Sequence, residues 1–193
     1  MTSLFRILTV CALTGGLCGL PLSTSQAASG NSAQLTLTLI MEQSTCDVGL
    51  LTPPDITFPP LSLSAVSVPG HILYAGNQTV TLGLTNCAGS AKAGAVPAIQ
   101  IQGTNPITSD PTIFREYAST AGGNVGFGLR YQPSSGQPGP YLTSGDYVDL
   151  GKAGDEVQDQ NLDFLVDMLR GAGGDTPTAG MLLAHIRFQF AYH

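Results

Sequence analysis

The sequence predicts an all-β fold, a sandwich of short strands joined by turns. Apolar and polar residues alternate near both ends of the chain, once an N-terminal leader is set aside, as expected for strands with one buried face. Between these ends lie short apolar runs separated by turn residues, and the chain holds 24 glycines and 13 prolines. That composition favours many short strands over long helices. Hydrophobic residues make up 42% of the chain, which is enough for one sizeable core.

Residues 1–28 have the pattern of a secretory signal peptide. Arg6 supplies the positive start, residues 7–20 form an uncharged apolar stretch, and small residues around Ala27 offer a cleavage point. The apolar stretch is shorter than the ~20 residues that a membrane-spanning helix needs, and it is interrupted by glycines. We therefore expect an exported protein rather than a membrane-anchored one, and the remainder has the length of one domain.

Residues 33–41 form the first predicted strand. Its odd positions are apolar, whereas most of its even positions are polar, so one face of the strand can be buried. The apolar face consists of Ala33, Leu35, Leu37, Leu39 and Met41.

Two cysteines remain after the leader, Cys46 and Cys87. Exported proteins form disulfides in oxidising compartments, and two cysteines permit a single pairing. A zinc site is the alternative, but these cysteines lack both CxxC spacing and a nearby pair of histidines. We therefore predict a Cys46–Cys87 disulfide, which would stabilise the fold by about 4 kcal/mol by restricting the unfolded chain.

Further strands are predicted along the rest of the chain. Four short apolar runs bounded by turn residues lie at residues 79–84, 96–101, 125–131 and 147–150. Residues 162–169 fit helical spacing but also fit a strand with one apolar face, so periodicity alone leaves this element open. The last predicted strand alternates up to the penultimate residue, with its apolar face made by Ala184, Ile186, Phe188, Phe190 and Tyr192.

Taken together, these features resemble the type 1 pilin family, whose subunits are assembled into fimbriae by the chaperone–usher route. The resemblance rests on the signal peptide, the alternating arm before Cys46, and Cys87 at the end of an alternating strand. The most specific feature is C-terminal: Tyr192 is the penultimate residue, and Gly180 is the fourteenth from the end. The resemblance extends over essentially the whole chain after the leader, and it favours a strand at residues 162–170.

The resemblance implies an incomplete immunoglobulin-like β-sandwich, the pilin fold, which is completed by a donor strand. The signal peptide would be residues 1–28, the donor-strand arm residues 29–43, and the pilin domain residues 44–193. A periplasmic chaperone would lend the missing strand, and at the outer-membrane usher the arm of a neighbouring pilin subunit would replace it. The subunit would thus be exported through the periplasm to the cell surface, where it would form part of a fimbrium.

The resemblance also assigns residues to the two sides of this exchange. The donor strand would use Ala33, Leu35, Leu37, Leu39 and Met41, and the groove would be formed by the C-terminal strand with Gly180, Ile186, Phe188, Phe190 and Tyr192. Donor arms of the family usually carry a glycine at one pocket position, whereas the apolar register of residues 33–41 contains none. The register therefore stays open: residues 35–41 could instead belong to the subunit's own first strand, with a shorter arm at residues 28–34.

Composition and motifs argue against several other functions. The net charge of −6 and the scattered basic residues exclude a nucleic-acid partner. Nucleophile-elbow, zinc-protease and phosphate-loop motifs are missing, so we predict no enzyme activity, no cofactor and no metal. Acidic residues gather between Asp146 and Asp175 without the spacing of a calcium-binding loop, and we expect them on solvated turns and outward strand faces.

Two alternatives to a structural fimbrial subunit remain. The first is a minor or tip-proximal subunit that binds a host receptor with its own surface, since one domain leaves no room for a separate lectin domain. The second, from another class, is a self-contained secreted β-sandwich that acts as a binding module. Such a module would need neither a free N-terminal strand nor an open groove.

Overall fold

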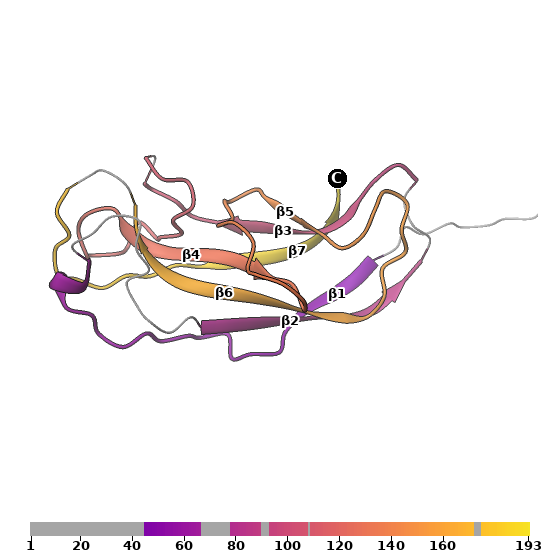
Figure 1. Cartoon of the computed structure of the whole chain (residues 1–193), viewed down its shortest axis with the longest axis horizontal. Helices are drawn as coiled ribbons and strands as arrows, with labels where there is room; N and C mark the ends of the chain where they lie inside the picture. Colours follow the sequence, from indigo (N-terminus) through magenta and orange to yellow (C-terminus); the bar gives the residue numbers. More distant parts are fainter. Residues whose placement is uncertain (1–44, 67–77, 90–92, 108, 172–174) are drawn as a thin grey trace, which may run out of the picture. The chain divides into compact units, whose positions relative to one another are not determined.

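The computed structural model describes residues 45–66, 78–89, 93–107, 109–171 and 175–193. All of them belong to one compact unit, and almost all regular structure in it is β-strand (Figure 1). The elements are β1 (Thr45–Leu50), a short 3-10 helix η1 (Leu63–Val66), β2 (Gln78–Ala88), β3 (Pro97–Gly103), β4 (Val125–Gln132), β5 (Tyr147–Asp149), β6 (Gln160–Arg170) and β7 (Ile186–Tyr192).

The described strands form two antiparallel sheets. The first has the order β1-β2-β6-β4 and the second the order β5-β3-β7. Side chains from both sheets meet in one apolar core. Phe164 of β6 lies at its centre, with ring centroids 5.5 Å from Tyr131 and 5.0 Å from Phe188 of the other sheet. The predicted all-β sandwich is therefore confirmed at the level of two packed antiparallel sheets.

Most of the predicted strands are present. Residues 79–84, 96–101, 125–131, 147–150 and 184–192 correspond to β2, β3, β4, β5 and β7. The ambiguous segment at residues 162–169 is a strand, β6, rather than a helix. The predicted strand at residues 33–41 lies outside the described residues. β1 has no counterpart among the predicted strands, because its Asp47 and Gly49 are residue types that strands disfavour.

The predicted disulfide is confirmed. Cys46 of β1 is bonded to Cys87 of β2, across a sequence separation of 41. The two strands are antiparallel neighbours, and their register shifts between Thr45 and Asp47, beside the disulfide. The covalent bond therefore joins an edge strand to the interior of its sheet.

One acidic residue, Asp167, is buried, although the carboxylates between Asp146 and Asp175 are expected to be solvated. Asp167 of β6 is 1% exposed, because the outer face of β6 is covered as well as the inner one. Its Oδ2 lies 2.7 Å from Nη2 of Arg130 and accepts a hydrogen bond of 3.0 Å from the Tyr141 hydroxyl. Asp167 is thus a paired, buried charge, and the expectation of a solvated position is wrong for this residue.

Candidate functional site

The free edge of β7 is the first component of the candidate site. β7 lies at the end of its sheet and pairs only with β3 among the described strands. Val96 and His193 exchange both backbone hydrogen bonds, at 2.9 and 3.1 Å. In an antiparallel pair such positions alternate, so residues 187, 189 and 191 bond to β3. The N–H and C=O groups of Ile186, Phe188, Phe190 and Tyr192 consequently point to the open side.

A groove runs along this open side. One wall, residues 50–63, begins at the last residue of β1, and the other, residues 177–188, leads into β7 and includes its first three residues. Two adjoining cavities of about 590 and 380 Å³ lie between these walls, and both are lined by Ile56, Phe58, Phe127 and Leu182. The two cavities are therefore parts of one groove.

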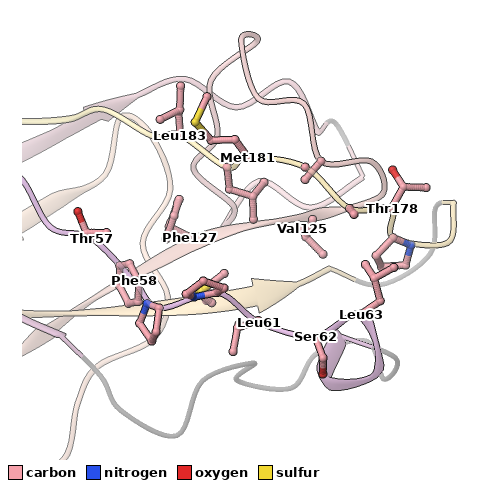
Figure 2. A pocket seen from close by; sticks show the side chains of 18 of the residues that line it. Thr57, Phe58, Leu61, Ser62, Leu63, Val125, Phe127, Thr178, Met181 and Leu183 are labelled. Atoms are coloured by element: carbon pink, nitrogen blue, oxygen red, sulfur yellow. The ribbon is translucent and has the colours of Figure 1, made fainter.

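The floor of the groove is the apolar core itself. Figure 2 shows the wall at residues 57–63 facing the wall at residues 178–183, with Val125 and Phe127 of β4 between them. Val166 and Met168 of β6 also belong to the floor. Of the described residues that line the groove, only Asp55 and His185 are ionisable. The groove thus offers an apolar surface with hydrogen-bonding groups along one side.

Large apolar side chains remain exposed along the groove. Leu50, Leu63 and Met181 line it and are 46%, 50% and 55% exposed. Ile186 and Phe188 are only half-buried, although both pack on the main core. A contiguous apolar surface of this kind is typical of an interaction site rather than of ordinary solvent-exposed surface.

Two pairs of prolines interrupt the wall at residues 50–63. Residues 50–63 contain Pro53, Pro54, Pro59 and Pro60, and a proline has no N–H to donate. This wall therefore cannot form a continuous hydrogen-bonded ladder with an added strand. The regular backbone donors and acceptors of the groove are those of the β7 side.

Gly180 lies at a point where the backbone makes a close approach. A Cβ atom at this position would lie 2.3 Å from the backbone nitrogen of Ala121 and 2.5 Å from its Cα. Only glycine fits such an approach without displacement of backbone atoms. Gly180 therefore lets the wall at residues 177–183 pack directly against residues 120–121.

Arg115 holds the loop that leads into β4. Its guanidinium donates hydrogen bonds to the carbonyl oxygens of Gly123 at 2.8 Å and Val125 at 3.1 Å, and also to that of Ala121. Burial lowers the pKa of Arg115 from its ordinary value. Because Ala121 and Val125 line the groove, this side chain fixes part of its floor.

The predicted groove residues do not all lie at the same place. Gly180, Ile186 and Phe188 line the groove. Phe190 and Tyr192 lie farther along β7 and line neither cavity, and their rings pack edge to face at 5.4 Å. The predicted donor residues Ala33, Leu35, Leu37, Leu39 and Met41 lie outside the described residues.

Sequence reasoning missed one wall of the groove. Residues 50–63 read as turn material because of their prolines, yet Ile56 and Phe58 pack on the core and line both cavities. The alternation of Ile56, Thr57 and Phe58 between the proline pairs is the signal that could have identified this wall. The floor residues Val125 and Met168 were predicted as strand residues, but without a role at the site.

Comparison of the sequence with known protein families and with curated proteins finds no match. Within the described ranges, no group of three or more His, Cys, Asp or Glu side chains is placed to hold a metal ion. The same ranges contain no helix with the length and apolar character needed to cross a membrane.

Proposed function

We propose that this protein is a structural subunit of an adhesive fimbria, polymerised by donor-strand exchange through the chaperone–usher pathway. The observation that carries the proposal is the free edge of β7 beside an apolar groove. An unpaired edge of this kind accepts an extended peptide, because backbone hydrogen bonds and pockets for alternate side chains are both available.

The strand order supports an immunoglobulin-like sandwich that lacks its last strand. Immunoglobulin constant-type domains place strands A, B, E and D in one sheet and C, F and G in the other. The order β1-β2-β6-β4 matches the order A-B-E-D, and β3 beside β7 matches C beside F, with β5 on the far side of β3. Among the described residues, no strand takes the position of G, which would lie beside β7.

The N-terminal arm has the composition needed to fill this position. Residues 33–41 present an apolar side chain at every second position, the same spacing as the inward-facing residues of β7. If four of these side chains are fully buried, the gross gain is about 6–12 kcal/mol before the cost of ordering the arm. An arm from a neighbouring subunit could therefore join two copies without a covalent bond.

The partners follow from this mechanism. A periplasmic chaperone protects the edge before assembly, the outer-membrane usher is the place of exchange, and neighbouring pilin subunits form the polymer at the cell surface. In this role the protein is no enzyme, and it requires neither a cofactor nor a metal.

A peptide-binding experiment tests the proposal. The chain of residues 29–193 carries Leu37→Asp and Leu39→Asp, which prevent its own arm from filling a groove; we name this variant the arm-blocked chain. A synthetic peptide of residues 29–43 should raise its midpoint of thermal unfolding and slow amide exchange at Ile186, Phe188 and Phe190.

A control peptide with aspartate at positions 37 and 39 should do neither. If the arm-blocked chain is already stable, monomeric and unaffected by the wild-type peptide, donor-strand exchange is refuted. A self-contained secreted binding module would then be the better description.

A further inference from the structure

The edge that faces the groove does not end where β7 begins. Residues 181–185 lead into β7, and they are held from one side by residues 116–121. The backbone N–H of Met181 donates to Oγ1 of Thr120 at 2.9 Å, and its carbonyl accepts from the N–H of Thr120 at 2.9 Å. The backbone of Met181 is thus fully bonded on the side away from the groove.

Leu183 is held in the same way. Its N–H donates to Oγ of Ser119 at 3.1 Å, and its carbonyl accepts from the N–H of Glu116 at 2.7 Å. Oγ of Ser119 also lies 3.2 Å from this carbonyl, within hydrogen-bond distance. We name Ser119 and Thr120 the hydroxyl clamp, because their side chains bond the backbone of the groove wall.

Hydrogen bonds to the clamp fix the direction of the backbone N–H and C=O groups of the neighbouring residues. In extended chain, backbone groups of successive residues face opposite sides, so those of Leu182 and Ala184 face away from residues 116–121. Neither residue forms a backbone hydrogen bond with another described residue. Both also line the groove. The N–H and C=O groups of both residues therefore face the same side as those of Ile186, Phe188, Phe190 and Tyr192, which point to the open side.

We propose that the hydroxyl clamp lengthens the docking edge from β7 back to Leu182, so that an added strand pairs along residues 182–192. This inference rests on the proposed function and deepens it. The occupant is the arm of residues 29–43 of a second copy, because its apolar side chains repeat at the spacing of the edge. Residues 182–192 extend over about 35 Å at ~3.3 Å per residue, a length that the arm can span.

The clamp also positions the larger cavity of the groove. Leu182, Leu61 on the opposite wall and Met168 on the floor belong to one apolar cluster, and all three line this cavity. Pairing at Leu182 would bring an arm side chain over the cavity, whereas pairing with β7 alone would leave it empty. Ser119 and Thr120 are thus positioning residues, which act through the wall rather than by contact with the arm.

Residue-resolved amide exchange with the arm-blocked chain and the peptide of residues 29–43 tests this inference. We expect the peptide to protect Leu182 and Ala184 together with Ile186, Phe188 and Phe190. The Ser119→Ala/Thr120→Ala variant should lose the protection at Leu182 and Ala184 only, and it should release the peptide about tenfold faster.

Two further variants make the test specific. Ser119→Thr/Thr120→Ser keeps both hydroxyls and should restore the wild-type behaviour. Ser134→Ala/Ser135→Ala removes two hydroxyls from the exposed turn after β4, which lines neither cavity of the groove, and should change nothing.

Each outcome has one meaning. Protection of Ile186, Phe188 and Phe190 without Leu182 and Ala184 in the arm-blocked chain overturns the longer edge but leaves the proposed function intact. Equal protection and equal release rates with and without the clamp hydroxyls overturn their positioning role. Absence of protection at every one of these amides contradicts the proposed function itself.

Discussion

At the scale of single residues, the groove depends on a position that tolerates no side chain. Gly180 has a φ angle outside the left-handed region, so glycine is needed there for space rather than for backbone conformation. The atoms in the way are backbone atoms of residues 120 and 121, which cannot move without disturbing the hydroxyl clamp.

Gly180→Ala should therefore destabilise the protein by about 1–3 kcal/mol, the usual cost of overpacking. Urea unfolding of the arm-blocked chain measures this. Gly49→Ala is the matched control, because a Cβ at Gly49 meets nothing within 4 Å, and its effect should stay within about 0.5 kcal/mol. Equal stability of the two variants would show that the wall can shift freely at Gly180.

The buried carboxylate of Asp167 leads to a second prediction. Arg130 both bonds this carboxylate and lies 5.0 Å from the centre of the Tyr141 ring. Arg130→Met should destabilise the protein by about 3–5 kcal/mol, because it leaves a buried charge without its counter-ion. The double variant Arg130→Met/Asp167→Leu should be more stable than the single one in urea unfolding. A double variant that is less stable would contradict this account.

Tyr141 gives the same network a pH dependence. Burial, followed by the charge of Asp167, raises the pKa of Tyr141 to about 12 from a model-compound value of 10.0. The unfolded chain therefore loses this proton at lower pH than the folded protein does. The contribution of protonated Tyr141 to the stability of the folded protein is present below about pH 10 and is lost as the pH rises to about 12. Stability of the wild type should fall more steeply over this interval than that of Tyr141→Phe, and parallel curves would refute the assignment.

At the scale of elements, the disulfide joins the edge strand β1 to β2. Restriction of the unfolded chain by this bond should be worth about 4 kcal/mol. Cys46→Ala/Cys87→Ala should lose about that much in urea unfolding, and a reductant should weaken the wild type but not the variant. If reduction leaves the wild type unchanged, the β1–β2 pairing alone would account for the position of β1.

The elements also show how far the sequence is informative. Alternation predicts β2 and β7, and short apolar runs between turn residues predict β3, β4 and β5, because each of these strands has one face in the core. Neither pattern predicts β1, whose half-buried residues are only Cys46 and Val48, on either side of Asp47. Periodicity does not separate helix from strand at β6. Leu165, Asp167 and Leu169 are buried as well as the residues of the inner face, and a strand that is buried on both sides loses its alternation.

The site was less predictable than the fold. The alternation of the last strand predicts that Ile186 and Phe188 share an apolar face, and the resemblance to a family assigns them, together with Gly180, to the groove. The wall at residues 50–63 and the hydroxyl clamp are products of tertiary contacts between segments far apart in the sequence, such as Ser119 and Leu183. Periodicity reports on burial within one segment, and it carries no information on such pairs.

At the scale of the whole molecule, the proposed function predicts self-association through the arm. The chain of residues 29–193 should form polymers that elute ahead of the monomer in gel filtration. Leu37→Asp/Leu39→Asp should keep it monomeric, because charged side chains cannot enter an apolar groove. Thr36→Asp/Thr38→Asp is the matched control, since it adds the same charge to the opposite face of the arm.

The same control variant also tests which face of the arm is the donor face. If the substitutions at Thr36 and Thr38 block assembly and those at Leu37 and Leu39 do not, residues 35–41 are not the donor face in the register proposed. Polymers that persist in both variants would place the contact between subunits elsewhere.

The disulfide has a mechanical consequence in such a polymer. Tension between subunits would enter each one at the N-terminal side of β1 and reach Cys46, the second residue of that strand. From there it would pass through the covalent bond to Cys87 in β2, which pairs with both β1 and β6. Peeling of β1 from its sheet would thus be stopped at the first backbone hydrogen bonds between β1 and β2. The sandwich would then be pulled as a whole rather than unravelled from its edge.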